Sequence, residues 1–456
     1  MPKLFRAQVA LAGLLFCVCG PAAHGQGGSP STPNSVDDII AKVLRDNPST
    51  TPSSIAASPP KSKAPASQPI VMSVRIGDHS DRTRFVVELS DPMNLRTFTL
   101  NNPNRVVIDM PAVQWRLSGP PRPTTRSAIR SYRYGLFRPG NSRFVIDLNQ
   151  PVSLTDALVL PPENGFGYRI VIDLFPVTQA KFDQTAGWPA DLKARETAAE
   201  RVASLPLTER PSPPIARGRK IIVIDPGHGG IDSGTNGVNG LLERDLVLDE
   251  GLRLASALRR NHHYTVYMTR DSDVFIPLRE RVNIGRTYHA DLFVSLHADS
   301  NPDSSVAGLS IYTLSESGSD KEAAALARKE NQSDIIAGVD LGGENSAVAP
   351  ILLDLEQRDT MNKSSRFAQI ALKSVANATD ILPRRPHRSA AFVVLKAPDV
   401  PSVLIELGYL SNSDDAAQMN TARWRNGVAD AIAAAVERHF APAAVAAPAS
   451  MAPVSE

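Results

Sequence analysis

Short β-branched runs fill the chain from Ile70 to about Phe175, and Pro, Gly or Asn separates each run from the next. No stretch there has the 3.6-residue period of a long helix, so the pattern predicts an all-β domain. Four runs resemble one another: Arg84-Phe-Val-Val-Glu-Leu, Arg105-Val-Val-Ile-Asp-Met, Arg143-Phe-Val-Ile-Asp-Leu and Arg169-Ile-Val-Ile-Asp-Leu. Their short-long-short spacing predicts two similar halves that form a small sandwich. The regular Arg and Asp residues fit either a solvated face or a binding surface.

From about Lys220 the pattern changes to alternating strands and helices. That order predicts an α/β domain with a mostly parallel sheet and helices on both of its faces. The predicted strands are Ile221–Asp225, Tyr264–Thr269, Leu292–Leu296, Leu309–Thr313, Phe392–Leu395 and Val403–Leu407, and the predicted helices are Arg244–Arg260, Leu278–Tyr288, Ser365–Asn377 and Trp424–Phe440. The predicted fold class is therefore an α/β domain preceded by a small all-β sandwich.

The remaining segments lack the apolar content of a folded core. Residues 1–25 have the features of a signal peptide, with Lys3 and Arg6 ahead of an apolar run and small residues at its end. We expect a disordered linker at 26–69, an extended linker at 177–217 and a disordered tail at 441–456. The β domain then spans residues 70–176 and the α/β domain residues 218–440.

Charge and cysteine content narrow the function classes. The formal net charge of +2 corresponds to Lys3 and Arg6, which are lost with the signal peptide, so the mature chain is near neutral and bulk electrostatics do not favour nucleic acid. Both cysteines, Cys17 and Cys19, lie in the signal peptide, which leaves no thiol nucleophile in the mature chain. No later apolar run is long enough to cross a bilayer, so we expect no transmembrane anchor.

Three reactive side chains follow predicted strands of the α/β domain. His228 follows the first strand through a Gly-rich turn, His297 directly follows Leu296, and Glu406 lies near the end of the last strand. In an open parallel sheet such positions meet beyond the carboxyl ends of the strands. Glu243 comes from the loop that opens the first helix. Two imidazoles and one carboxylate with an open fourth position form a common ligand set for catalytic zinc, which leaves Glu406 to move the proton.

Other reactive-site patterns fit this domain less well. The turn Asp225-Pro-Gly-His-Gly-Gly could bind an anion, but it lacks the lysine of a P-loop and the spacing of a dinucleotide site. The chain has no His-Glu-x-x-His motif and no Gly-x-Ser-x-Gly elbow, which disfavours the standard metalloprotease and serine hydrolase classes. A metal site built from dispersed residues remains.

Four motifs in the α/β domain resemble, in order, those of the zinc-dependent N-acetylmuramoyl-L-alanine amidases: Asp225-Pro-Gly-His-Gly-Gly, Leu242-Glu-Arg-Asp, Ser295-Leu-His-Ala-Asp and Glu406-Leu-Gly-Tyr-Leu-Ser-Asn. The resemblance covers Lys220 to about His439. It implies one Zn²⁺ on His228, Glu243 and His297, with Glu406 as the catalytic acid and base. The implied reaction is hydrolysis of the amide between N-acetylmuramic acid and L-alanine in peptidoglycan, in cell wall remodelling and daughter-cell separation.

The β domain resembles the AMIN domain that precedes such amidases in Gram-negative bacteria. This resemblance rests on the pattern and order of the strands. It implies a periplasmic protein, exported by its signal peptide and directed to peptidoglycan at the division septum. We expect a monomer with no nucleic-acid partner.

Some members of the amidase family carry an inserted helix that covers the zinc and places a glutamate in its open ligand position. Residues 330–362 are the candidate regulatory insert in this chain, and an ordinary surface insertion is the alternative. The resemblance implies that Glu330, or Glu344 as the second choice, occludes the metal. A LytM-type activator protein would then draw the helix away.

Five further residues are candidates for supporting roles. Arg270, Arg279 and Asn283 would orient loops or bind substrate, and Asp225 and Asn412 would support the metal ligands or bind peptide. Structural roles at strand ends, helix caps and turns stay open for all five. Two alternative functions also stay open: a catalytically silent peptidoglycan-binding scaffold at the division site, and a zinc endopeptidase of the cell wall.

Overall fold

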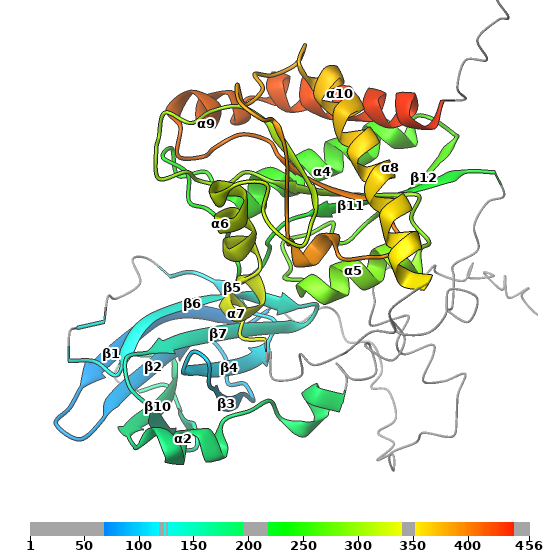
Figure 1. The fold of residues 1–456 in the computed structure, drawn as a ribbon. Helices are drawn as coiled ribbons and strands as arrows, with labels where there is room; N and C mark the ends of the chain where they lie inside the picture. Colours follow the sequence, from blue (N-terminus) through cyan, green and yellow to red (C-terminus); the bar gives the residue numbers. More distant parts are fainter. Residues whose placement is uncertain are drawn as a thin grey trace, which may run out of the picture.

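The computed structural model describes residues 68–117, 123–124, 126–163, 165–194, 218–339 and 352–441, with the backbone only for residues 352–356. These residues form an all-β domain and an α/β domain that lie against each other (Figure 1). The predicted fold class is confirmed. The predicted signal peptide lies outside the described residues, as do nearly all of the linker predicted at 26–69 and of the tail predicted at 441–456.

The β domain is a sandwich of two sheets. One sheet has the order β5-β1-β2-β10-β8, with β9 also paired to β10, and the other has the order β3-β4-β7-β6. The strands are β1 (Ile70–Asp78), β2 (Thr83–Leu89), β3 (Arg96–Leu100), β4 (Arg105–Pro111), β5 (Gln114–Trp115), β6 (Ile129–Arg138), β7 (Asn141–Leu148), β8 (Val152–Leu154), β9 (Leu158–Leu160) and β10 (Tyr168–Pro176).

The four similar sequence runs form β2, β4, β7 and β10. Strands β2 and β10 are neighbours in one sheet, and β4 and β7 are neighbours in the other, so each predicted half contributes one strand to each sheet. Alternate residues of a strand point to opposite faces. The apolar residues that follow each motif arginine therefore fill the core between the sheets, as Phe85 and Phe144 do. The Arg and Asp residues of the motif lie on the two outer faces.

Helix α2 (Gln179–Thr185) follows the last strand of the β domain. The hydroxyl of its N-cap Thr178 accepts a hydrogen bond from the Lys181 N–H, and Phe182 is fully buried against the sandwich. The sequence predicted an extended linker over 177–217; its first residues instead form this packed helix, and residues 195–217 lie outside the described residues. A helix of two turns with one buried side chain has too weak an apolar period to be seen in the sequence.

The α/β domain is built on one sheet with the order β12-β11-β13-β16-β14-β15. Every neighbouring pair is parallel except β14 with β16. The strands are β11 (Lys220–Pro226), β12 (Tyr264–Met268), β13 (Leu292–His297), β14 (Ser310–Leu314), β15 (His387–Ala390) and β16 (Ser402–Glu406). Strands β13 and β16 are buried along their whole length, as expected for parallel strands covered on both faces.

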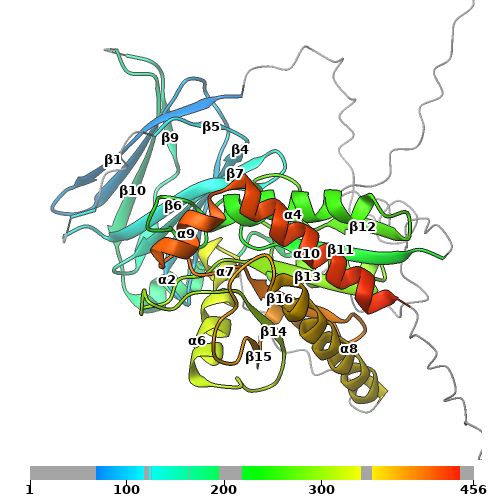
Figure 2. The same ribbon diagram turned by 90° about the horizontal axis from the view of Figure 1, so that it is seen from above.

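Helices cover both faces of this sheet (Figure 2). On one face lie α4 (Glu243–Arg259), α8 (Leu352–Val375) and α10 (Ala422–Phe440), and on the other lie α5 (Leu278–Thr287), α6 (Lys321–Glu330) and the 3₁₀ helix η3 (Val393–Leu395). Two short helices, α7 (Ser333–Ile336) and α9 (Ser413–Met419), complete the domain. None of the helices in the described ranges is long and apolar enough to cross a membrane.

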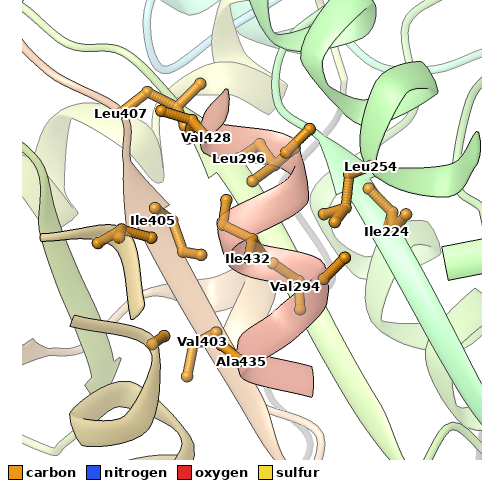
Figure 3. Close-up of a cluster of buried hydrophobic side chains, with 14 of the residues drawn as sticks. Ile224, Leu254, Val294, Leu296, Val403, Ile405, Leu407, Val428, Ile432 and Ala435 are labelled. Atoms are coloured by element: carbon orange, nitrogen blue, oxygen red, sulfur yellow. The ribbon is translucent and has the colours of Figure 1, made fainter. Parts of the chain in front are cut away.

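The largest core packs between the sheet and α10. Figure 3 shows Val428, Ile432 and Ala435 of α10 facing the strand residues Val294 and Ile405. All five side chains are fully buried. This packing holds β13 and β16 side by side, so the residues at their carboxyl ends have fixed relative positions.

One predicted strand of the α/β domain is wrong. Residues Phe392–Leu395 were predicted to be a strand, but Val393–Leu395 form the helix η3, and the strand β15 lies earlier at His387–Ala390. A four-residue apolar run suits a buried strand and a buried helical turn equally, because both bury every residue. Helix α8 also begins at Leu352, well before the predicted start at Ser365.

Candidate metal centre

The carboxyl edge of the α/β sheet brings the predicted ligands together. Strand β11 leads through a turn to His228, β13 ends at His297, and β16 ends at Glu406. His297 and Glu406 lie opposite each other in the parallel pairing. Glu243 is the first residue of α4, which starts at the same edge. All four side chains are buried.

Glycines allow the backbone to come close to these ligands. His228 itself has a φ of 56°, a left-handed conformation that is uncommon outside glycine and is often found at functional sites. A Cβ at Gly227 would lie 2.4 Å from the His297 ring, and a Cβ at Gly234 would lie 2.7 Å from Glu243 Oε2. Any larger residue at these two positions would displace a predicted ligand.

Four possible ligand atoms surround one buried point. Glu243 Oε1 lies 3.0 Å from His228 Nε2 and 3.2 Å from His297 Nδ1. Glu330 Oε2 lies 3.3 Å and 3.2 Å from the same two nitrogen atoms. Within the described part of the chain, His228 Nε2 and both Glu330 oxygens have no contact with hydrogen-bond geometry. We call the space among these four atoms the metal point.

The donor set and its spacing fit a zinc ion. Ligand atoms roughly 2.1 Å from a tetrahedral ion are roughly 3.4 Å apart, close to the distances around the metal point. Imidazole nitrogen and carboxylate oxygen are both ordinary zinc ligands. His228, His297 and Glu330 also meet the geometric condition for holding a metal ion by themselves. His297 Nδ1 is hydrogen-bonded to Glu243 Oε1, whereas His228 Nε2 and the two Glu330 oxygens have no partner among the described residues, and an ion at the metal point would give them one.

The charges around the metal point keep its carboxylates ionised. Burial alone would raise their pKa values, but the two imidazoles outweigh it, so the pKa of Glu243 falls well below its usual value and that of Glu330 falls to about 2. Burial lowers the pKa of His297, yet Glu330 and Glu243 raise it to about 9. A divalent cation would take the place of the imidazole protons, because metal ligands bind in their deprotonated forms.

Asp232 orients the first ligand. Its Oδ2 lies 2.9 Å from His228 Nδ1, so Nδ1–H donates to the carboxylate and Nε2 is the ring nitrogen directed at the metal point. The same carboxylate accepts hydrogen bonds from the Ser333 hydroxyl and the Gly234 N–H. Asp232 was not predicted from the sequence. The signal that could have revealed it is a carboxylate four residues after a candidate ligand histidine, within the same Gly-rich turn.

Glu243 is held by two backbone donors. The Thr235 N–H donates to Oε2 at 2.8 Å, and the Ala298 N–H donates to Oε1 at 2.9 Å. The side chain is fully buried. Its position is therefore fixed before any metal binds, and its negative charge is stabilised by hydrogen bonds.

Asp225 and Arg281 form a buried pair behind the ligands. Asp225 accepts hydrogen bonds from the hydroxyls of Thr269 and Ser295 at 2.6 and 2.7 Å, and from Arg281 Nη1 at 2.8 Å. Arg281 also donates to the His228 carbonyl at 2.6 Å, which fixes the turn that carries this ligand. Asp225 was predicted to support the ligands, whereas Arg281 was not singled out in the sequence.

Arg270 also binds the turn rather than the metal point. It donates to the carbonyls of Pro226, Gly227 and Arg244. The burial of its guanidinium lowers the pKa to about 9. These contacts correspond to the loop-orienting role considered for it in the sequence.

Glu406 lies beside the ligands with one oxygen uncommitted. Its Oε2 accepts a hydrogen bond from the Asp299 N–H at 2.9 Å, and its Oε1 has no hydrogen-bond partner among the described residues. Burial raises its pKa to about 8; His297 opposes this shift, and Glu243 and Glu330 add to it. A carboxyl group with a pKa near neutrality can both accept and donate a proton.

Helix α6 ends at the metal point. Glu330 is its last residue, and Lys329 forms an ion pair with Asp299. The Asn331 amide donates to the Ala391 carbonyl at 3.0 Å and anchors the residue after the helix. The cavity that remains, lined by Glu330 and the histidines among other residues, has a volume of about 10 Å³, roughly enough for a single water. On this side of the histidines the space left beside Glu330 therefore holds no group larger than water.

The predicted regulatory insert began at residue 330, but the helix that carries Glu330 begins at Lys321 and has Asp320 as its N-cap. The predicted insert therefore starts at the C-terminal end of α6, and residues 340–351 of it lie outside the described residues. Glu344, the second candidate for the occluding ligand, lies outside the described residues.

Three other predicted residues lie away from the ligands. Arg279 and Asn283 are half-buried on α5 and do not line the small cavity at the metal point. Asn412 is the N-cap of α9, where its Oδ1 accepts hydrogen bonds from the N–H groups of Asp414 and Asp415. Its amide also donates to the Ser304 carbonyl at 2.8 Å. For Asn412 the structure shows the capping role that the sequence left open.

Comparison with known proteins identifies the family. The model of the N-acetylmuramoyl-L-alanine amidase family matches residues 222–438, and the model of the AMIN domain matches residues 73–159. The N-acetylmuramoyl-L-alanine amidase AmiC of Escherichia coli is 35% identical over 387 residues, which cover 81% of this chain and 89% of that protein. This chain belongs to the N-acetylmuramoyl-L-alanine amidase family. The resemblance seen in the sequence motifs is confirmed.

Two more relatives show how far the similarity extends. AmiC of Neisseria meningitidis is 34% identical over 379 residues, covering 82% of this amidase and 90% of the relative. AmiA of Escherichia coli is 39% identical over 224 residues, covering 49% of this amidase and 77% of the relative. The AmiC matches are long enough to include residues of both domains of this amidase.

Proposed function

We propose that this amidase hydrolyses the amide bond between N-acetylmuramic acid and L-alanine in peptidoglycan, with one Zn²⁺ held by His228, Glu243 and His297. The observation that carries the proposal is the convergence of three ligand atoms on one buried point beside the free oxygen of Glu406. Zinc bound there would polarise the amide carbonyl and lower the pKa of a water molecule to roughly 7.

Glu406 is proposed to carry the proton. In its ionised form Oε1 accepts a proton from the attacking water, and in its protonated form it donates that proton to the amide nitrogen as the C–N bond breaks. Its place opposite His297 puts it next to the ligands. The hydrogen bond from the Asp299 N–H holds the other oxygen and so fixes the direction in which Oε1 points.

The conformation with Glu330 at the metal point is proposed to be a resting state. Glu330 fills the position that water and the substrate carbonyl need, and the ion pair of Lys329 with Asp299 holds the end of α6 in place. Activity then requires α6 to move. A LytM-type activator protein is the proposed cause of that movement.

The proposed function also implies where in the cell the amidase acts. The match to the AMIN domain and the AmiC relatives support a periplasmic enzyme at the division septum of a Gram-negative bacterium. Export would use the signal peptide predicted at residues 1–25. Peptidoglycan is the proposed partner of the β domain as well as the substrate, and the enzyme is proposed to act as a monomer in cell wall remodelling and daughter-cell separation.

Digestion of purified peptidoglycan tests this function. The mature chain, with and without Glu330→Ala, is incubated with the wall after zinc has been added or chelated, and the soluble products are identified by mass spectrometry. Free stem peptides that begin with L-alanine, lost on chelation or with Glu406→Ala, would establish the amidase. Peptides cut between stem residues would indicate an endopeptidase. Wall binding without any soluble product would indicate a scaffold.

A further inference from the structure

Helix α7, which follows α6 closely in the chain, lies against the β domain. Backbone carbonyls at its end and in the residues just after it accept hydrogen bonds from arginine side chains of the β domain. Arg105 Nη1 donates to the Ile335 carbonyl at 2.7 Å, and Arg143 Nη1 donates to the carbonyls of Ala337 and Gly338 at 3.1 and 3.2 Å. Three further contacts complete the set: Arg133 donates through Nε to the Ile336 carbonyl and through Nη2 to the Ile335 carbonyl at 3.4 Å, and Trp188 Nε1, in the segment after α2, donates to the Gly338 carbonyl at 3.3 Å. The last carbonyls of a helix lack partners within the helix, and arginine is a suitable donor for them.

An apolar layer continues this contact. Ala337 and Val339 share one buried cluster with Val107 and Val145, which lie on the outer face of the β3-β4-β7-β6 sheet. A Cβ at Gly338 would lie 3.0 Å from Val145, so the backbone lies close against the sheet. Figure 1 shows α7 lying where the α/β domain meets β6 and β7. We call residues 335–339 the docked segment.

The other sheet of the sandwich shows the same motif without this cover. Arg84 makes two hydrogen bonds of 2.7 Å with Asp173, and Arg143 makes the equivalent two with Asp109 at 2.5 and 2.8 Å. The side chain of Arg84 is 37% exposed, whereas that of Arg143 is 0% exposed. The cross-strand ion pair is thus common to both sheets. The burial of Arg143 is due to the groups that pack over this sheet, namely the docked segment and the ring of Phe137, whose centroid lies 3.4 Å from the guanidinium carbon, and not to the motif.

We propose that the β domain holds the docked segment and thereby keeps Glu330 at the metal point. This inference rests on the proposed occlusion by Glu330. Few residues separate Glu330 from Ile335, and Ser333 and Asp334 are hydrogen-bonded to Asp232 and to the Leu278 N–H of the α/β domain. Glu330 therefore cannot withdraw far while the carbonyls of the docked segment stay bonded to the β domain.

The coupling runs in both directions. Any event that separates the β domain from the docked segment favours the open site, and opening of the site weakens the contact between the domains, because the two equilibria are linked. The β domain then acts as a regulator of the active site in addition to its proposed role in wall binding. The outer face of the β3-β4-β7-β6 sheet serves this function, while the outer face of the other sheet does not contribute.

Hydrogen exchange of the full mature chain, read by mass spectrometry, tests this proposal. The amides of Ala337, Gly338 and Val339 are bonded within the α7 turn and report on its opening. Arg143→Gln is expected to raise their exchange rates roughly tenfold, the effect of losing hydrogen bonds from a charged donor. The matched control is Arg84→Gln, which breaks the equivalent ion pair on the other sheet and should leave these amides unchanged. If Arg143→Gln does not fold, Arg105→Gln is used in its place. That substitution removes the hydrogen bond to the Ile335 carbonyl and leaves the ion pair of Arg143 with Asp109 intact.

Basal amidase activity of the same zinc-loaded variants is the second readout, with Glu330→Ala run in parallel. The proposal expects activity to rise with the exchange rates in the Arg143 and Arg105 variants and to stay constant in the Arg84 variant. Unchanged exchange in both test variants, or an equal rise in the control, would overturn it. Faster amide exchange in the Arg143 and Arg105 variants without higher amidase activity would also overturn the proposal, provided that Glu330→Ala is active. If Glu330→Ala shows no gain, occlusion itself fails, and that result is read independently of the exchange data.

Discussion

Oε2 of Glu330 lies 3.3 Å from Nε2 of His228, in a contact without hydrogen-bond geometry. Glu330 is at the end of α6 and His228 is in the turn after β11, so the two residues are far apart along the chain. A carboxylate in this position either completes the ligand set of a metal or blocks its open side. In the proposed resting state Glu330 would do both, because its carboxylate would bind the metal at the position that water and substrate need.

Replacing Glu330 with Ala should raise basal amidase activity. Loss of the carboxylate removes the favoured contact of the closed state and shifts the population of α6 toward open positions, by roughly tenfold or more. Release of dye-labelled peptidoglycan by the zinc-loaded chain measures the change. Glu322→Ala is the control, because Glu322 lies on the same helix with 71% of its side chain exposed. Equal rates for both variants would contradict occlusion by Glu330.

Asp232→Asn should weaken zinc binding. The amide can no longer supply the negative charge that fixes the protonation of His228 Nδ1, and loss of such a partner typically costs ten- to hundredfold in metal affinity. Competition with a chromophoric chelator measures the affinity without any need for activity. Asp245→Asn is a suitable control, since this residue is in the first turn of α4 and its side chain is 53% exposed. An unchanged affinity in Asp232→Asn would remove it from the metal centre.

Glu406→Gln should abolish catalysis while zinc stays bound. The amide has the same shape but cannot accept the proton, and removal of a general acid and base typically costs 10²- to 10⁴-fold in rate. The comparison is made in the Glu330→Ala background, so that occlusion does not hide the effect. Zinc content by elemental analysis shows whether the ligands are intact. A variant with full zinc and full activity would show that another group moves the proton.

Glu250→Gln should stabilise the fold, and more so at higher pH. Glu250 is fully buried on α4, its carboxylate oxygens have no hydrogen-bond partner among the described residues, and burial raises its pKa from 4.5 to about 8. Between these values the folded chain keeps a proton that the unfolded chain releases. The free energy of unfolding therefore falls as the pH rises through this window, by up to about 1.4 kcal/mol per pH unit.

Thermal unfolding at several pH values measures this effect. The difference in melting temperature between Glu250→Gln and the parent should be small near about pH 5 and grow toward about pH 8. Glu437→Gln on the exposed side of α10 provides the control. A difference that is constant with pH would show that Glu250 does not carry the proton.

Local sequence patterns predicted most of the framework because they follow from short-range physics. Period-two alternation in the run from Arg84 predicts a strand with one apolar face, and the structure uses that face in the core of the sandwich. His228, His297 and Glu406 could be assigned to one edge because parallel strands end together. Phe392–Leu395 was misassigned because so short an apolar run has no period to distinguish a strand from a helical turn.

By itself, the sequence determined the two-domain fold class, the four motif strands and the set of chemically competent residues, since each depends on neighbours along the chain. Only the tertiary structure decided that Glu330 faces the histidines and that Asp232 and Arg281 fix the ligands. It also decided that the outer face of the β3-β4-β7-β6 sheet, with its motif arginines, is covered by another part of the chain. The contact of Arg105 with Ile335 spans 230 residues, and the equivalent surface of Arg84 stays exposed. The motif arginine is therefore buried on one sheet and partly exposed on the other, because its burial depends on which distant segment of the chain packs against it.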